Sequence, residues 1–264
     1  MQLQQNLDQF RNAGISVFAI SYDEVDAQHA FAEEFGITYP LLADPDHKAI
    51  EATGVLNTLV RPDEEGIYGV PFPGSYMVGT DGTVEEKLFF QHYRTRPSAA
   101  TVLREGFGLD FEVGMNPRAD DDGEGVRVAA TLGGAGMVFM ETSTLYVDFD
   151  LDEGLHIYGT PIPEGYTATE VSVSGPERVR IGAPRYPGTK PFKVEGLAEE
   201  FQVLDGDPRV AVSIQSSLNE GESFPLEVTV KYQACTDSEC MLPQTQTLNL
   251  EVPIHPLNLP APRG

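Results

Sequence analysis

The sequence predicts an α/β domain followed by an all-β sandwich, and three observations lead to that prediction. Segments with helical and strand-like hydrophobic patterns alternate up to about residue 106. A polar, strongly acidic stretch follows, and beyond it short strands of alternating polarity replace the helical period. A chain of 264 residues is long enough for two domains, each with a core of its own.

The first block, residues 1–106, begins with a helix. Leu3, Leu7 and Phe10 recur at helical spacing, and Gly14 can end the helix. Residues 15–20 are apolar enough to form a buried strand. The elements expected after this strand are a helix capped by Asp23 and ending at Gly36, a strand at 40–43, a helix opened by Asp44 and Pro45, a hairpin around Asp81 and Gly82, and a helix over 97–104.

The second block is separated from the first by a predicted acidic linker at 107–125, which looks too polar and charged to pack. Residues 126–255 then form the predicted β-sandwich, because Gly and Pro interrupt short alternating segments at short intervals. Residues 256–264 are proline-rich and are expected to be a flexible tail. The clearest strands are expected at 145–149, 168–173 and 226–230.

The charge of the chain excludes several classes of partner. It has 41 acidic against 17 basic residues, a formal net charge of −24. Nucleic acids and anionic membrane surfaces both need a basic face, so neither is expected as a partner. No segment approaches the ~18 apolar residues of a membrane helix, so no membrane insertion is expected. The acidic surface either recognises a positive patch on a partner or keeps the chain soluble, and the second reading is the simpler one.

The sequence offers few candidates for bound cofactors. His29, His47 and His92 lie on separate predicted elements, without the spacing of a metal site, and are interpreted as surface or core histidines. The glycine-rich residues 132–136 have no phosphate-binding lysine and should form a loop. We therefore expect no cofactor and no metal.

Three segments of the first block carry a family resemblance. They are residues 18–23 (FAISYD), 35–44 (FGITYPLLAD) and 71–76 (PFPGSY), the last just ahead of the Asp81-Gly82 turn. Their order and spacing resemble the AhpC/TSA (redoxin) group of peroxiredoxins over about residues 1–106. The resemblance implies a thioredoxin-like fold with a reactive cysteine at the N-terminus of the first long helix, where the helix dipole favours a thiolate.

The first block departs from this pattern at the reactive cysteine. Met1 falls inside the first long helix, and residues 1–125 contain no cysteine. The thioredoxin-like domain is therefore expected to be incomplete, as a truncated product or as a remnant that serves as a scaffold. It should lack a central strand, expose a sheet edge and turn over no peroxide. Pro73 matches either the cis-proline of thioredoxin folds or an ordinary turn proline.

The second block carries another resemblance. Residues 231–245 (KYQACTDSECMLPQT) and 151–159 (LDEGLHIYG) resemble the N-terminal, periplasmic domain of DsbD, and the likeness covers roughly 126–252. It implies an immunoglobulin-like sandwich whose redox-active pair, Cys235 and Cys240, relays electrons to thiol–disulfide exchange proteins. Tyr158 and Tyr232 are the expected supporting residues. The family also implies a periplasmic or other extracytoplasmic location, although no signal peptide is visible in this chain.

Pairing of the two cysteines requires a turn between them. Five steps of extended strand separate Cα atoms by roughly 16 Å, whereas a disulfide needs less than ~7 Å. The chain must then reverse within residues 236–239, all of types that tolerate a turn. Closing so short a loop stabilises a fold by only ~2 kcal/mol, which makes a purely structural role less attractive.

Two functions follow from these observations. In the first, Cys235 and Cys240 exchange electrons with protein partners, slowly in isolation because Asp237 and Glu239 lie between them and disfavour a thiolate. By analogy with the family, Cys240 is expected to attack first. The alternative is a non-catalytic redoxin-like and β-sandwich interaction protein with a structural disulfide. The sequence does not determine an oligomeric state.

Overall fold

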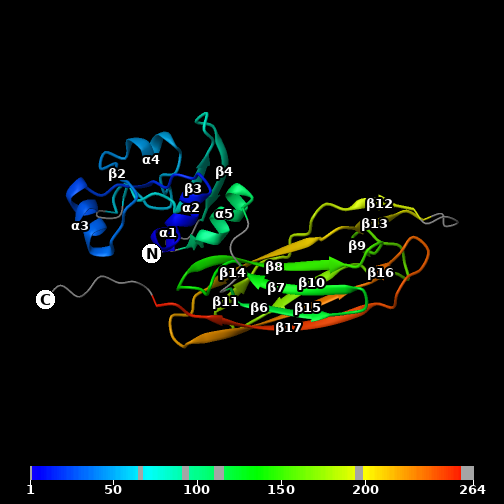
Figure 1. The fold of residues 1–264 in the computed structure, drawn as a ribbon. Helices are drawn as coiled ribbons and strands as arrows, with labels where there is room; N and C mark the ends of the chain where they lie inside the picture. The colour runs from blue at the N-terminus through cyan, green and yellow to red at the C-terminus, as the bar shows by residue number, and fades with distance from the viewer. Residues whose placement is uncertain (1, 65–67, 91–94, 110–115, 194–198, 257–264) are drawn as a thin grey trace. The chain divides into compact units, whose positions relative to one another are not determined.

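The computed structural model describes residues 2–64, 68–90, 95–109, 116–193 and 199–256. His92 and residues 257–264 of the expected tail lie outside these ranges. The chain forms two compact units, residues 1–110 and residues 111–256 (Figure 1). The predicted succession of an α/β block and a β-sandwich is confirmed.

Unit 1 alternates helices and strands. Strand β1 pairs in parallel with β2, and β3 pairs with β4 in an antiparallel hairpin. Its elements are α1 (Gln2–Gln5), α2 (Leu7–Asn12), β1 (Ala19–Ser21), α3 (Val25–Phe35), β2 (Leu41–Ala43), α4 (Lys48–Ala52), β3 (Gly74–Val78), β4 (Val84–Phe89), β5 (Arg96–Pro97) and α5 (Ala99–Phe107).

Local signals set most boundaries of unit 1. Helix α3 ends at Gly36, whose φ of 61° lies in the left-handed region that glycine adopts without strain. Asp44 accepts hydrogen bonds of 2.9 Å from the backbone N–H groups of Ala49 and Ile50, and so satisfies donors at the start of α4. In the β3–β4 hairpin, Asp81 accepts a bond of 2.9 Å from the Thr83 N–H. The end of α3 at Gly36 and the turn at Asp81 are confirmed. Helix α4, however, begins at Lys48 with His47 as its N-cap, so Asp44 and Pro45 precede the helix instead of opening it.

Two further expectations for unit 1 are wrong. The N-cap of α3 is Glu24 rather than Asp23, because the helix begins only at Val25. The buried strand expected at 15–20 shrinks to β1, and the side chains of Phe18 and Ile20 are 61% and 49% exposed. Strand β1 has β2 as its one neighbour in the described part of the chain, so the layer that would bury these side chains is small.

Unit 2 is built from three sheets. Their strand orders are β10-β15-β17, β11-β14-β8-β7-β6 and β12-β13-β9-β16, and neighbouring strands within each sheet are antiparallel. The strands are β6 (Arg118–Asp122), β7 (Val126–Leu132), β8 (Glu141–Leu151), β9 (His156–Tyr158), β10 (Glu170–Ser174), β11 (Val179–Ile181), β12 (Lys190–Phe192), β13 (Phe201–Leu204), β14 (Arg209–Ser216), β15 (Ser223–Tyr232), β16 (Ala234–Cys235) and β17 (Gln244–Pro253).

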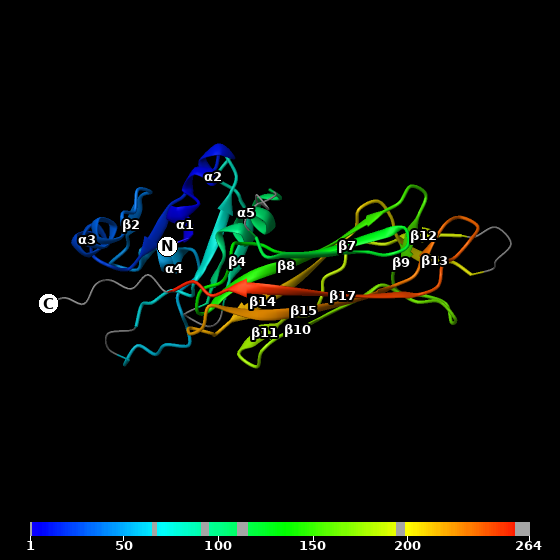
Figure 2. The ribbon, with the colours of Figure 1, turned by 60° about the horizontal axis from the view of Figure 1, so that its bottom comes forward.

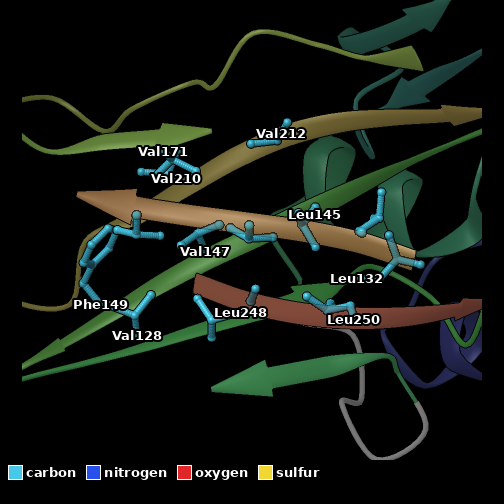
Figure 3. Packing of buried hydrophobic residues seen from close by; sticks show 14 of the residues in the cluster. Val128, Leu132, Leu145, Val147, Phe149, Val171, Val210, Val212, Leu248 and Leu250 are labelled. Carbon is cyan, nitrogen blue, oxygen red and sulfur yellow. The ribbon is translucent and has the colours of Figure 1, made fainter. Parts of the chain in front are cut away.

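The core of unit 2 lies between the sheets β10-β15-β17 and β11-β14-β8-β7-β6. In β15 and β17 buried and exposed residues alternate strictly, which places one apolar face of each strand inward. Figure 3 shows side chains of β7, β8 and β14 meeting those of β10 and β17. Residues labelled there are Val128, Leu132, Leu145, Val147, Phe149, Val171, Val210, Val212, Leu248 and Leu250. This packed interior is the rigid base of the unit.

The acidic segment expected to be part of a linker is instead partly a strand. Residues 118–122 form β6, which pairs with β7 along its length. Arg127 on β7 lies 2.6 Å from Asp120 and 3.6 Å from Asp122, and Arg118 lies 3.7 Å from Asp120. Backbone pairing and these opposite charges make the segment compatible with a sheet edge, where charged strands are common.

The four-stranded sheet β12-β13-β9-β16 lies at one end of the sandwich in both ribbon views (Figures 1 and 2). Strand β9 is central in it: β13 pairs on one side and β16 on the other. Strand β16 ends in Cys235, and the segment leading to β17 carries Cys240. The fold therefore holds the cysteine segment at the end of a rigid sandwich.

Candidate redox site

Cys235 and Cys240 form a disulfide with their Cα atoms 4.1 Å apart. The chain reverses between them, because the backbone N–H of Thr236 donates a 2.8 Å hydrogen bond to the carbonyl oxygen of Glu239. The Thr236 hydroxyl oxygen also accepts a 3.0 Å bond from the Glu239 N–H. The turn predicted within residues 236–239 is confirmed.

The two sulfurs have different surroundings. Cys235 is completely buried, whereas Cys240 is exposed. The Tyr158 hydroxyl lies 3.3 Å from Cys240 Sγ, within hydrogen-bonding distance for sulfur. Of the two residues, only Cys240 is open to solvent.

An aromatic cluster surrounds the buried end of the disulfide. Cys235 packs with Tyr158, Phe201 and Val203, and further aromatic side chains cover them. The Tyr158 and Phe201 rings stack with centroids 5.1 Å apart, and the Tyr166 ring meets both edge-on at 5.5 and 4.8 Å. Burial raises the pKa of the Tyr158 phenol, so this hydroxyl stays protonated at neutral pH. It can donate a hydrogen bond to a sulfur.

His156 lies at the buried edge of the same site. It is directly opposite Cys235 in the β9–β16 ladder and is only 5% exposed. Its ring contacts that of Phe192 with centroids 4.4 Å apart. Burial lowers the pKa of His156, and the charges of Asp237 and Asp205 oppose that shift in part. The imidazole is therefore neutral at pH 7 in the disulfide form.

Tyr232 lies in a different part of unit 2. It is fully buried in the main core, where its ring meets Phe149 edge-on at 6.2 Å and its hydroxyl donates a 3.3 Å bond to Gln244. Burial, with a smaller effect of Asp121, raises the pKa of its phenol to about 12. The structure thus brings Tyr158 together with the cysteines and places Tyr232 in the cluster that supports the sandwich.

Sequence reasoning missed His156 and the aromatic residues Tyr166, Phe192 and Phe201. A signal existed for His156, because it precedes Tyr158 by two residues in a strand and so shares its face. No comparable signal exists for the others. Phe201 on β13 and Phe192 on β12 reach the site through the pairing of β9 with β13 and of β13 with β12, and Tyr166 lies in the connection between β9 and β10.

The other singled-out residues show no second site. His29 lies 3.7 Å from the carboxylate of Glu33, and the His47 ring stacks on Tyr22 at 6.0 Å. In the described ranges no group of three or more His, Cys, Asp or Glu side chains could hold a metal ion. The cis peptide bond in those ranges precedes Pro161, so Pro73 follows a trans bond. Within them there is also no helix long and apolar enough to cross a membrane.

Comparison with known proteins separates the two parts of the chain. Residues 1–87 match the AhpC/TSA family, and residues 136–252 match the N-terminal family of the thiol:disulfide interchange protein DsbD. Each part of the chain therefore resembles a different family. The first part is thioredoxin-like, and the second is an immunoglobulin-like sandwich. The disulfide lies within the part that matches the interchange-protein family.

Individual known proteins also align with parts of this chain. Peroxiredoxin Bcp of Escherichia coli is 30% identical over 103 residues, which cover 38% of this chain and 62% of that protein. The N-terminal periplasmic domain of ScsB from Proteus mirabilis aligns with a TM-score of 0.35 and 21% identity, over 53% of this chain and 50% of that one. A complex of the DsbD and PilB N-terminal domains from Neisseria meningitidis aligns with a TM-score of 0.29 and 16% identity. The alignment covers 44% of this chain and 81% of the matched chain.

Proposed function

We propose that unit 2 relays electrons between thiol–disulfide exchange proteins through Cys235 and Cys240, and that partners attack at Cys240. The observation that carries this proposal is the difference in exposure: Cys240 is open and Cys235 is buried against aromatic rings. A structural staple needs no accessible sulfur, whereas exchange needs one. The match of this region to an interchange-protein family supports the same reading.

The exchange proceeds in two steps. A partner thiolate attacks Cys240 Sγ, the Cys235–Cys240 bond breaks, and the Cys235 sulfur leaves with the electron pair. The partner's second thiolate then attacks its own sulfur in the mixed disulfide and releases Cys240. The partner dithiol is thereby oxidised to a disulfide and the cysteine pair is reduced by two electrons, with each released thiolate taking up a proton. Delivery to an acceptor is the reverse sequence.

The turn gives the site a charge preference. Asp237 and Glu239 are exposed beside Cys240 and disfavour a second negative charge there. A partner with a positive patch would neutralise them and favour the approach of its thiolate. The proposed partners are therefore proteins with a reactive cysteine beside basic residues. For the reduced chain alone, we expect slow alkylation at neutral pH.

Redox titration of the full chain in glutathione buffers tests the proposal. A potential less negative than about −300 mV supports exchange, and a lower one supports the structural alternative. The variants C235S and C240S provide a matched pair for trapping. C235S should form a mixed disulfide with glutathione through the exposed Cys240, and C240S should not. Equal trapping by both variants would contradict the role given to Cys240.

A further inference from the structure

One polar group at the redox site remains unexplained by the exchange steps. The Nε2 atom of His156 is buried and has no hydrogen-bond partner in the part of the chain that the structure describes. The side chain as a whole is 5% exposed. A buried polar group without a hydrogen-bond partner destabilises a fold, so its presence at a reactive site calls for a functional explanation.

The position of His156 relates it to one sulfur in particular. His156 and Cys235 are directly opposite in an antiparallel ladder, so their side chains share a face with Cβ atoms about 4.5–5.5 Å apart. The cluster on that face includes Tyr158, two residues after His156, and Cys235 itself. The sulfur of Cys240, by contrast, contacts the Tyr158 hydroxyl. Each sulfur thus has its own polar neighbour on β9.

The two exchange steps place different demands on the two sulfurs. Cys240 is exposed, and water can stabilise any charge on it. Cys235 leaves with the electron pair while fully buried, and a lone buried anion is strongly disfavoured. A good leaving sulfur requires a stabilised thiolate, which a neighbouring imidazolium provides.

We propose that His156 takes up a proton when the disulfide opens and pairs, as an imidazolium, with the Cys235 thiolate. The inference rests on the proposed exchange at Cys240. The proton comes from solvent or from the attacking thiol, and it passes to Cys235 or stays on the ring once the pair is reduced. No further electrons are involved, so the two-electron balance of the exchange is unchanged.

The charges around His156 fit this role. Asp237 faces it from the turn after β16, and Asp205 faces it from the end of β13. Lys190 on β12 lies 2.9 Å from Asp205, and Lys193 pairs with Glu200 at 3.2 Å nearby in sequence. In the disulfide form burial outweighs the two carboxylates and keeps the ring neutral. A new negative charge on Cys235 adds to theirs and favours the protonated ring.

NMR titration of the full chain is the direct test. The ring signal of His156 is followed against pH in the oxidised chain and in the chain reduced with a phosphine. The midpoint should move upward on reduction, whereas that of exposed His255 in the same unit should not move. The variant C235S keeps a reduced Cys240 but cannot form the pair, so its His156 should titrate as in the oxidised chain. An unchanged midpoint in the reduced wild type would overturn the inference.

Kinetics give a second readout. Reduction of the disulfide by glutathione should slow roughly tenfold or more in H156F and in H156Q, with loss of the wild-type pH profile in the acidic range. H255Q is the matched control and should react like the wild type. H156Q keeps a polar side chain but cannot take up a proton, so it distinguishes the loss of proton uptake from disturbed packing. A wild-type rate and profile in H156Q contradicts the inference. If glutathione does not reduce the disulfide of the wild type, the proposed function is wrong. The NMR titration still tests whether His156 pairs with the Cys235 thiolate.

Discussion

The two units of this chain bury their apolar residues to different extents. In unit 1 large apolar side chains such as Phe18, Val25 and Leu59 are 61%, 66% and 70% exposed. In unit 2 the sheets β10-β15-β17 and β11-β14-β8-β7-β6 bury one continuous cluster between them. The difference follows from sheet construction: in the described ranges, the pairs β1–β2 and β3–β4 of unit 1 are separate two-stranded sheets, whereas the sheets of unit 2 have three or more strands.

The comparison shows where chemistry can be placed in this chain. In the proposed exchange, the buried Cys235 and the buried His156 need fixed surroundings, and unit 2 supplies them through antiparallel ladders on both sides of β9. The sequence of unit 1 contains no cysteine, and several of its large apolar side chains are exposed to solvent. The thiol chemistry therefore belongs to the better-packed unit.

The largest expected effect is the loss of stability when a phenylalanine is truncated in unit 2 and not in unit 1. Phe149 is 1% exposed in the core of unit 2, and F149A should lower the free energy of unfolding of that unit by about 3–5 kcal/mol. The matched change F18A, at an exposed phenylalanine of unit 1, should change stability by no more than about 0.5 kcal/mol. Hydrogen exchange resolved by peptide measures each unit within the full chain. Equal losses in both variants would contradict the difference in packing.

An alkaline titration sharpens the description of the unit 2 core. Tyr232 has a pKa of about 12 in the fold, against ~10 for tyrosine in an unfolded chain. The unfolded chain ionises first, so stability is fully present below pH ~10 and falls as the pH rises towards 12, by about 2–3 kcal/mol in total. Y232F should lack this component. Parallel pH dependence in the variant and the wild type, measured by denaturant unfolding, would argue against a buried phenol.

Removal of the disulfide should have a smaller effect than either change in the core. The double variant C235A/C240A loses a bond that closes a very short loop, so the free energy of unfolding should fall by about 2 kcal/mol. Denaturant unfolding of the variant and of the oxidised wild type gives the difference. A loss above about 4 kcal/mol would mean that the bond is a main support of unit 2, and would favour the structural alternative.

The smallest expected effect concerns a helix end in unit 1. Ser98 caps α5, and its hydroxyl oxygen accepts a 3.0 Å hydrogen bond from the Thr101 N–H. S98A should destabilise this unit by about 1 kcal/mol, which peptides from α5 should report as faster hydrogen exchange. S16A changes an exposed serine of the same unit and should have no such effect. Identical exchange in both variants would show that the cap contributes little.

Sequence patterns predicted the elements best where one face of a strand is buried. The alternation at 226–230 lies within β15, and the segment 145–149 lies within β8. The pattern was misleading at 118–122, because a run of acidic residues resembles a linker unless Arg127 of the partner strand is known to lie beside it. It was also misleading at residues 15–20, since an apolar run does not reveal how many strands will cover it.

Some features of the candidate site could likewise be predicted from the sequence, and others could not. Cys235, Cys240 and the turn between them could be read from the sequence, because a disulfide over so short a loop depends only on local geometry. Tyr158 came from a family resemblance and lies at the site, whereas Tyr232 came from the same source and lies in the core. Adjacency to a cysteine along the chain does not fix the direction of a side chain.

The sequence alone therefore determined the order of the two domains, the pairing turn and the absence of cysteine from residues 1–125. Only the tertiary structure decided that Cys235 is buried, that Cys240 is open and that His156 faces Cys235. The physical reason is strand register. Strands β9 and β16 are far apart in the chain, and they meet residue against residue only because the sandwich core fixes which face of each strand is buried.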